Sequence, residues 1–345
     1  MYKINFQKPI HIHFIGIGGI SMSGLAEILL EEGFTVSGSD AKESPLTKKL
    51  ESEGAVIHYG QCAENITDDI NCVVYTAAIN KSNPELMEAV GKKIPMLTRA
   101  ELLGQLMKNY DTPIAVSGTH GKTTTTSMIS EVLLAADMDP TISVGGILKT
   151  IGGNIRVGKS GNFITEACEY TNSFLHFYPK ISVILNIEED HLDFFKDLED
   201  IRHSFHQFSA LLPSDGTLII NGDIKDYQEI YEGLDCNVIT YGSSAEFDYS
   251  ATEIQYDEKG FVSFELLKHN TSCGRVQLSV TGDHNVSNAL AAIATAELLG
   301  IPMDTIRKGL LSFSGTDRRF EYKGTFNGVT VVDDYAHHPT EIAAT

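Results

Sequence analysis

Short apolar runs alternate with amphipathic stretches along the first hundred residues. His11–Ile15 predicts a buried strand, and Met22–Glu32 has the apolar spacing of a helix that buries one face. Thr35–Gly38 and Cys72–Thr76 predict two further strands. Strands that alternate with helices are typical of a parallel, doubly wound α/β sheet, whose ligand lies at the carboxyl ends of the strands. We therefore expect a first α/β domain over residues 1–109.

A second α/β pattern begins at Pro113 and again places glycines directly after its first apolar run. Alternation of Thr, Tyr, Phe and Val with polar residues between Asn237 and Ser279 predicts an antiparallel section, and an alanine-rich helix is expected at Ser287–Leu299. We expect a mononucleotide-binding domain of the P-loop type over residues 110–314. Its other predicted strands are Pro113–Val116, Asn162–Thr165, Ile181–Leu185 and Thr217–Ile220.

The last thirty or so residues change character. Gly315–Phe320 has the composition of a linker, Val329–Asp334 predicts a strand, and a helix is expected to begin at Pro339. One strand and one helical turn cannot bury a core. We therefore interpret residues 315–345 as a linker and the start of a third domain. On this basis we expect a fragment that binds its nucleotide substrate but turns over poorly.

Composition and charge narrow the class of protein. The chain has 345 residues, of which 42% are hydrophobic and 21% are charged, as in globular proteins. A net charge of −20 opposes non-specific binding to nucleic acid. No apolar run is long enough to span a bilayer, and the five cysteines form no C-x-x-C pair. We expect a cytoplasmic protein with neither nucleic acid nor membrane as partner; its oligomeric state does not follow from the sequence.

The most informative motif is Ser117–Thr126, a glycine loop between an apolar strand and a threonine-rich helix start. Backbone amides in such a loop bind phosphates, Lys122 would place a charge on them, and Thr123 would be a ligand of Mg²⁺. A strict Walker A loop needs glycine where Val116 stands, so this loop is shorter. The alternative is a strand-to-helix turn with a chance lysine. Our candidate ATP-binding residues in the loop are Gly118, Thr119, Gly121, Lys122, Thr123 and Thr124.

An earlier glycine loop follows the first strand. Gly16, Gly18 and Gly19 match a dinucleotide fingerprint except that Ser21 replaces its third glycine, and Asp40 stands near the position of a ribose-binding acid. This loop alone leaves a nicotinamide cofactor open. An ATP-type loop in the same chain argues against one, because dehydrogenases have no use for it.

Acids, a histidine and two amides follow later predicted strands. Glu166 comes at the carboxyl end of a strand, where a carboxylate suits Mg²⁺. His191 follows another strand among acids and could be a metal ligand, a general base or an N-cap neighbour. Asn285 and Asn288 share one helix face and could read a base edge. Solvated loop acids and helix capping remain the alternatives.

Two motifs near the C-terminal end complete the set. Arg318 and Arg319 are adjacent, and the planar fork of arginine suits phosphate oxygens. Asp334 ends the last predicted strand and is followed by His337 and His338.

Taken in order, these motifs resemble the Mur ligase family. The resemblance covers all 345 residues and is strongest to members that join L-alanine to UDP-N-acetylmuramate in peptidoglycan precursor synthesis. It implies a Rossmann-like first domain that binds the UDP sugar, and a central ATP-binding domain. It further implies that ATP activates the muramoyl carboxylate as an acyl phosphate, which the alanine amine attacks. The motifs that carry it are Gly16–Ser21, Gly38–Asp40, Gly118–Thr123, Glu166–Glu169, Asp190–His191, His284–Asn288 and Asp333–Glu341.

The resemblance also implies roles for single residues. The catalytic set is Lys122 on phosphate, Glu166 and His191 at metal, and Arg319 on phosphate. Thr123 and Glu166 would hold one Mg²⁺, and Glu166 with His191 a second. Asn285 and Asn288 would contact adenine, and Asp334 the nucleotide. The UDP sugar would meet Gly16, Gly18, Gly19 and Ser21 at its pyrophosphate, Asp40 and Thr76 at uridine, and His120 on the muramoyl side.

The chain departs from the family pattern at Cys168, Tyr170 and Asn172, where many members are more acidic. A carbamylated lysine is not predicted, because Lys196 is the only lysine in the region that would carry it. Alternatives are a ligase that attaches a whole tripeptide to UDP-N-acetylmuramate, a NAD-dependent oxidoreductase, and a non-catalytic nucleotide-binding regulator.

Overall fold

The computed structural model describes residues 2–76, 78–316, 320–336 and 342–343. It divides into two compact units. Residues 1–110 with His176–Tyr178 form the first, and residues 111–175 with 179–345 form the second. Arg318, Arg319, His337, His338 and Pro339 lie outside the described residues.

The first unit is a parallel sheet of five strands in the order β3-β2-β1-β4-β5. The chain moves outward from β1 through β2 to β3 and then continues on the other side of β1 with β4, so the crevice of a doubly wound sheet lies between β1 and β4. The α/β prediction is confirmed, although β3 and β5 were not predicted. The strands are β1 His11–Ile15, β2 Thr35–Asp40, β3 Val56–Tyr59, β4 Cys72–Tyr75 and β5 Met96–Thr98, and the helices α1 Ile20–Glu31, α2 Pro45–Ser52, α3 Pro84–Gly91 and α4 Arg99–Met107.

Buried polar residues connect β1, β2 and α3 in this unit. His13 and Glu85 are both fully buried, and their Nε2 and Oε1 atoms lie 3.8 Å apart. Ser39 and Asn65 donate hydrogen bonds to the Glu85 carboxylate at 2.6 and 2.5 Å. Burial alone would raise the pKa of Glu85, but the His13 ring and these donors outweigh burial and hold the pKa below its ordinary value of 4.5.

Glu85→Gln should therefore destabilise the protein by about 2 kcal/mol at pH 7, since hydrogen bonds to a buried charge are lost. Because the folded-state pKa is lowered, the contribution of Glu85 is full above the ordinary pKa and is lost as the pH falls through the folded value. Urea unfolding between pH 7 and pH 3.5 measures it. The wild-type advantage over the variant should shrink only below about pH 4.5; a constant difference across this range would contradict the role of the charge.

The second unit contains a ten-stranded sheet in the order β15-β14-β13-β12-β11-β10-β6-β9-β7-β8. Its centre is parallel, whereas β13, β14 and β15 form antiparallel pairs. The antiparallel section was predicted to begin at Asn237, which is wrong: β12 starts there and pairs in parallel with β11. The strands are β6 Thr112–Ser117, β7 Thr141–Leu148, β8 Gly153–Arg156, β9 Asn162–Glu166, β10 Ile181–Ile184, β11 Thr217–Asn221, β12 Asn237–Gly242, β13 Tyr249–Tyr256, β14 Phe261–Lys268 and β15 Thr271–Thr281.

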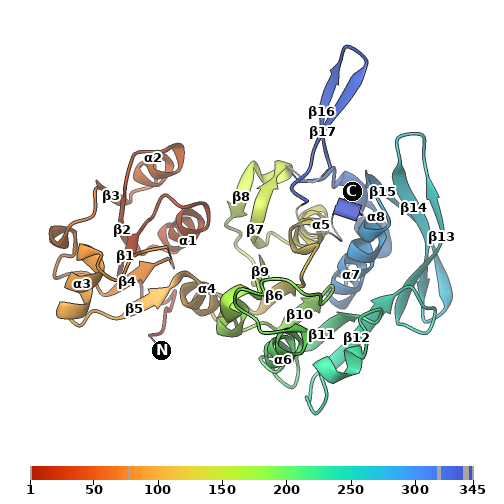
Figure 1. The fold of residues 1–345 in the computed structure, drawn as a ribbon, viewed down its shortest axis with the longest axis horizontal. Coiled ribbons are helices and arrows are strands. Elements are labelled where there is room, and N and C mark those ends of the chain that lie inside the picture. Colours follow the sequence, from red (N-terminus) through yellow and green to blue (C-terminus); the bar gives the residue numbers. More distant parts are fainter. Residues whose placement is uncertain (1, 77, 317–319, 337–341, 344–345) are drawn as a thin grey trace. The chain divides into compact units, whose positions relative to one another are not determined.

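Helices cover this sheet and place the glycine loop at its edge. Helices α5 (Lys122–Ala135), α7 (His284–Leu298) and α8 (Met303–Ser312) lie side by side, and α6 (Leu198–Ser209) lies apart from them across β10 and β11 (Figure 1). The main core joins α5, α7 and α8 to alternate apolar residues of β6 and β10. In Figure 1 the hairpin of β16 (Glu321–Phe326) and β17 (Val329–Asp333) extends away from the sheet; β16 was not predicted. Within the described part of the chain, no helix combines the length and apolar character of a bilayer span.

Candidate functional site

The predicted phosphate loop connects β6 to α5 at the carboxyl edge of the second sheet. Gly118 and Gly121 have φ values of +144° and +82°, which side chains other than glycine adopt at a cost. A Cβ at Gly118 would also lie 2.9 Å from the Leu185 Cβ. Gly121 is the N-cap of α5, so Lys122 is the first helical residue. The first amides of a helix have no partner within it and attract anions, as the sequence prediction required.

The residues after β10 hold this loop in place. Asn186 accepts a hydrogen bond from the Thr119 amide through its backbone oxygen, at 3.2 Å, and from the His120 amide through its side chain, at 2.7 Å. The Glu188 amide donates to the Thr119 hydroxyl at 2.9 Å. These two loop amides are thus used within the protein. Phosphate would instead be met by the amides at the start of α5, which agrees with a loop shorter than a Walker A motif.

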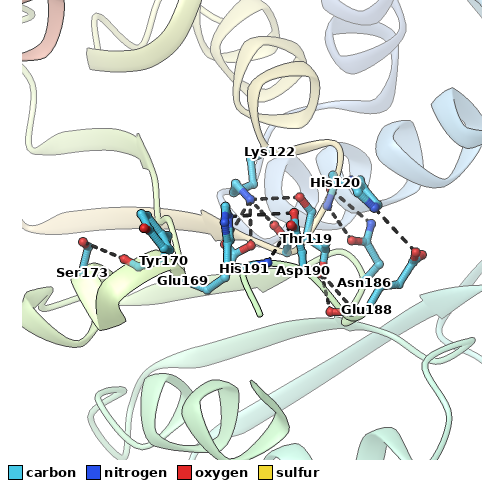
Figure 2. Close-up of polar contacts among 11 residues, drawn as sticks. Thr119, His120, Lys122, Glu169, Tyr170, Ser173, Asn186, Glu188, Asp190 and His191 are labelled. Carbon is cyan, nitrogen blue, oxygen red and sulfur yellow. Dashed lines mark hydrogen bonds and ion pairs between the residues drawn. The ribbon is translucent and has the colours of Figure 1, made fainter. Parts of the chain in front are cut away.

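Lys122 turns back toward the acidic motif that follows β9. Its ammonium group lies 3.0 Å from Oε2 of Glu169 and also donates to the carbonyl oxygens of Gly118 and Thr119 (Figure 2). The Glu169 side chain is 3% exposed and the Lys122 side chain 16%, so the ion pair is shielded from water. Sequence reasoning identified Lys122 and quoted Glu169 only within its motif.

Glu166 and Thr123 meet neighbouring residues of β7. The Gly145 amide donates to Glu166 Oε1 at 2.5 Å, and a Cβ at Gly145 would lie 2.8 Å from the other carboxylate oxygen. A Cβ at Gly146 would lie 3.1 Å from Thr123 Cγ2. The two glycines thus let both predicted Mg²⁺ ligands approach one short stretch of backbone. A hydroxyl and a carboxylate are hard oxygen donors that suit Mg²⁺.

The donor set is incomplete without a nucleotide. Among the described residues, no three His, Cys, Asp or Glu side chains gather closely enough to hold a metal ion. A Mg²⁺ ion at Thr123 and Glu166 would therefore need phosphate oxygens or water to fill its coordination sphere, as is usual for this ion.

His191 lies in the loop after β10 and has a positive φ of 53°. Its amide donates to Asp190 Oδ1 at 2.7 Å, and its backbone oxygen accepts from the amides of Phe194 and Phe195. The Tyr170 ring lies against the imidazole, with ring centres 4.4 Å apart and an angle of 31° between the planes. A hydrogen bond to Asp193 raises the pKa of the Tyr170 phenol. Figure 2 shows Tyr170 next to His191.

A cavity of about 470 Å³ extends from the start of α5 to the start of α7. Asn285 and Asn288 are nearly buried, and the Asn288 Nδ2 donates to Asn285 Oδ1 at 3.0 Å. Asn285 Nδ2 donates to the Thr281 backbone oxygen at 2.7 Å. The two amides thus orient each other at the cavity wall. Six predicted ATP-binding residues line the cavity, namely Gly121, Thr123, Thr124, Asn285, Asn288 and Asp334.

The glycine loop of the first unit is held by the end of β2. The Gly16 and Ile17 amides donate to the Ser39 oxygen, and the Gly18 amide donates to Asp40 Oδ2 at 2.9 Å. The Asp40 carboxylate also accepts from the Ala41 amide at 2.7 Å. Asp40 therefore braces the loop in this structure.

The other predicted UDP-sugar residues lie in three places: the start of α1, the end of β4 and the second unit. Gly19 is the N-cap of α1, and Ser21 accepts a hydrogen bond from Arg99 at 3.2 Å. The Thr76 hydroxyl, after β4, accepts from the Ala78 amide at 3.2 Å. His120 belongs to the second unit, where its ring lies 3.5 Å from the Glu188 carboxylate. Arg99 was missed, since an arginine at a helix start carries no motif of its own.

Comparison with known proteins supports the motif pattern. Residues 11–111 match the "Mur ligase family, catalytic domain" and residues 116–296 match the "Mur ligase middle domain". The UDP-N-acetylmuramate–L-alanine ligase of Agathobacter rectalis is 64% identical over 345 residues, which cover 100% of this chain and 75% of that protein.

Solved structures agree with this match. The UDP-N-acetylmuramate–alanine ligase of Thermotoga maritima is 30% identical with a TM-score of 0.82, covering 97% of this chain and 76% of that one. The UDP-N-acetylmuramate:L-alanyl-gamma-D-glutamyl-meso-diaminopimelate ligase of Neisseria meningitides is 31% identical with a TM-score of 0.81, covering 90% of this chain and 100% of that one.

Proposed function

The chain belongs to the Mur ligase family, and from that premise we propose that it joins L-alanine to UDP-N-acetylmuramate at the expense of ATP, in the synthesis of peptidoglycan precursors. The observation that carries the proposal is the 64% identity over the whole chain to a relative of that name. A reaction in the cytoplasm, where ATP is available, is part of the proposal.

The chemistry fits a site without a covalent nucleophile. A muramoyl carboxylate oxygen attacks the γ-phosphorus of ATP, and ADP leaves. The alanine amine then attacks the acyl carbon of the resulting acyl phosphate, inorganic phosphate leaves, and the amine loses a proton. Such steps depend on positioning and on neutralising charge. We propose that Lys122 and the first turn of α5 bind the phosphates, because Lys122 begins α5 and its neighbours Gly121, Thr123 and Thr124 line the cavity.

Further residues are assigned to the metal ions and to adenine. We assign Thr123 and Glu166 to one Mg²⁺, and Glu166 with His191 to a second; when bound, Mg²⁺ supplies positive charge to the phosphate oxygens. Asn285 and Asn288 are assigned to adenine and Asp334 to the nucleotide, since all three line the cavity. The phosphate contact assigned to Arg319 stays a prediction, because Arg319 lies outside the described residues.

In the first unit we assign the UDP sugar to the glycine loop and the carboxyl ends of β1 and β4. The helix start at Gly19 and Ser21 favours the pyrophosphate, and Arg99, which contacts Ser21, adds a positive charge there. Thr76 and Asp40 remain our candidates for the uridine end, and His120 for the muramoyl side.

Tripeptide attachment is the second candidate, favoured by the near-equal likeness to the Neisseria structure. Titration calorimetry should detect binding of UDP-N-acetylmuramate and of Mg-ATP, and none of NAD. For the reaction, the chain extended by the C-terminal quarter of the Agathobacter relative is supplied with either L-alanine or the tripeptide. Phosphate release with L-alanine alone supports the first candidate. Release with the tripeptide alone overturns it, and ATP binding without release with either would favour a regulator.

A further inference from the structure

The loop that departs from the family pattern adopts an unusual backbone. Thr171 and Asn172 have φ values of 54° and 56°, and His191 in the facing loop has 53°. Such conformations cost free energy in residues other than glycine and persist only where the surroundings enforce them. The Ser204 hydroxyl on α6 donates a hydrogen bond to the Asn172 side-chain oxygen. The Asn172 backbone amide donates to the Glu169 backbone oxygen at 2.9 Å. The loop that contains Thr171 and Asn172 is therefore held by contacts to α6 and to Glu169.

Tyr170 is the side chain that connects this loop to the loop of His191. Its ring lies on the imidazole at 4.4 Å, and its hydroxyl donates to Asp193 Oδ2 at 2.8 Å, two residues after the histidine. The Phe194 ring meets it edge-on, with centres 6.1 Å apart. Tyr170 thus contacts the histidine and the residues that follow it.

The position of Tyr170 argues against a role in core packing. The residue is 37% exposed, so one part of its ring reaches solvent while the rest contacts the loop of His191. Its ring contact adds to the 3.8 Å approach between His191 Nε2 and Asp190 Oδ2 in restricting rotation of the imidazole. Aromatic pairs of this kind contribute about 0.5–1.5 kcal/mol beyond the area they bury.

We propose that Tyr170 is a positioning residue that holds the His191 imidazole in the orientation used at the metal and phosphate end of the nucleotide. The role at the metal and phosphate rests on the proposed function. The ring contact between Tyr170 and His191 does not depend on it.

The geometry is tested first, without ligand, by NMR of the histidine ring protons. The His191 signals, identified among twelve histidines by their loss in His191→Ala, should be displaced upfield by the Tyr170 ring. Tyr170→Phe should keep this displacement and Tyr170→Leu should remove it. Unchanged signals in Tyr170→Leu would overturn the stacking whatever the ligand is.

The function is tested by the affinity for Mn²⁺ in the presence of a non-hydrolysable ATP analogue, followed by electron paramagnetic resonance. Tyr170→Leu should weaken Mn²⁺ binding about tenfold, as for other residues that orient a metal ligand, and Tyr170→Phe at most about threefold. Tyr178→Leu is the matched control, since Tyr178 is equally exposed at 37% but belongs to the first unit, and it should have no effect.

A double variant distinguishes a positioning role of Tyr170 from a general structural role. If Tyr170 acts through His191, Tyr170→Leu in a His191→Ala background should cause no further loss. An equal loss in both backgrounds, or a lost NMR displacement with unchanged Mn²⁺ affinity, would overturn the proposal. If the wild-type protein does not bind Mn²⁺ at all, the proposed function is contradicted. The NMR experiment still tests the contact between Tyr170 and His191 in that case.

Discussion

Replacing Lys122 by methionine is expected to weaken ATP binding by about 100-fold or more and to leave the affinity for UDP-N-acetylmuramate unchanged. Lys122 is the one lysine or arginine of the loop Ser117–Thr126, where we propose that phosphate binds, and charge-assisted contacts to phosphate are the strong ones. A 100-fold loss corresponds to about 2.7 kcal/mol. The UDP sugar serves as an internal control, because its predicted residues other than His120 lie in the first unit. Titration calorimetry with each nucleotide measures both affinities.

The same substitution leaves the buried Glu169 carboxylate without its partner, which separately destabilises the second unit. Lys122→Met with Glu169→Gln removes both charges and should recover much of the lost stability in urea unfolding, yet still bind ATP poorly. Recovery of ATP binding in this double variant would show that the single substitution had acted only through the fold. Normal ATP binding in Lys122→Met would show that the loop does not bind phosphate.

Strands could be predicted from the sequence wherever an apolar run ends in a motif. His11–Ile15 and Asn162–Thr165 were placed to within a residue, because a motif directly after each one, the glycine loop at Gly16 and the acid at Glu166, marks where the strand ends. The pairing direction at Asn237 was mispredicted, since alternating polarity describes a half-exposed strand whether its neighbour is parallel or antiparallel. Strand β16, from Glu321 to Phe326, was missed because its residues are mostly polar or exposed.

The site could be predicted as a set of residues but not as a set of contacts. Motif spacing brought Asn285 and Asn288 to one helix face, as the structure has them. The pairing of Lys122 with Glu169 joins residues 47 positions apart and depends on how β6 and β9 adjoin, which no local pattern encodes. The hydrogen bonds from the loop amides to Asn186 likewise depend on the pairing of β10 with β6. Tertiary contacts therefore decide which loop amides remain for a ligand.

The second large effect is expected in the packing of the helix that begins at the phosphate loop. At Gly309, α8 lies so close to α5 that an added Cβ would be 2.6 Å from the Val132 Cα and 3.0 Å from its nitrogen. Gly309→Ala must push the helices apart and should destabilise the second unit by about 1–3 kcal/mol, even after the helix-propensity gain of about 1 kcal/mol. Urea unfolding measures the loss, and the displaced α5 should also weaken ATP binding.

Gly91→Ala is the matched control for this packing. Gly91 is also in a helix, but nothing lies within 4 Å of the position its Cβ would take, so alanine there should be neutral or stabilising by up to about 1 kcal/mol. Val132→Ala should not fully rescue Gly309→Ala, because it removes the Val132 Cγ2 contact at 2.9 Å but leaves the Cα at 2.6 Å and the nitrogen at 3.0 Å in place. Full rescue by this second substitution would mean that the Val132 side chain, and not the approach of the two backbones, sets the spacing of α5 and α8. Equal stability of Gly309→Ala and Gly91→Ala would contradict the close approach altogether.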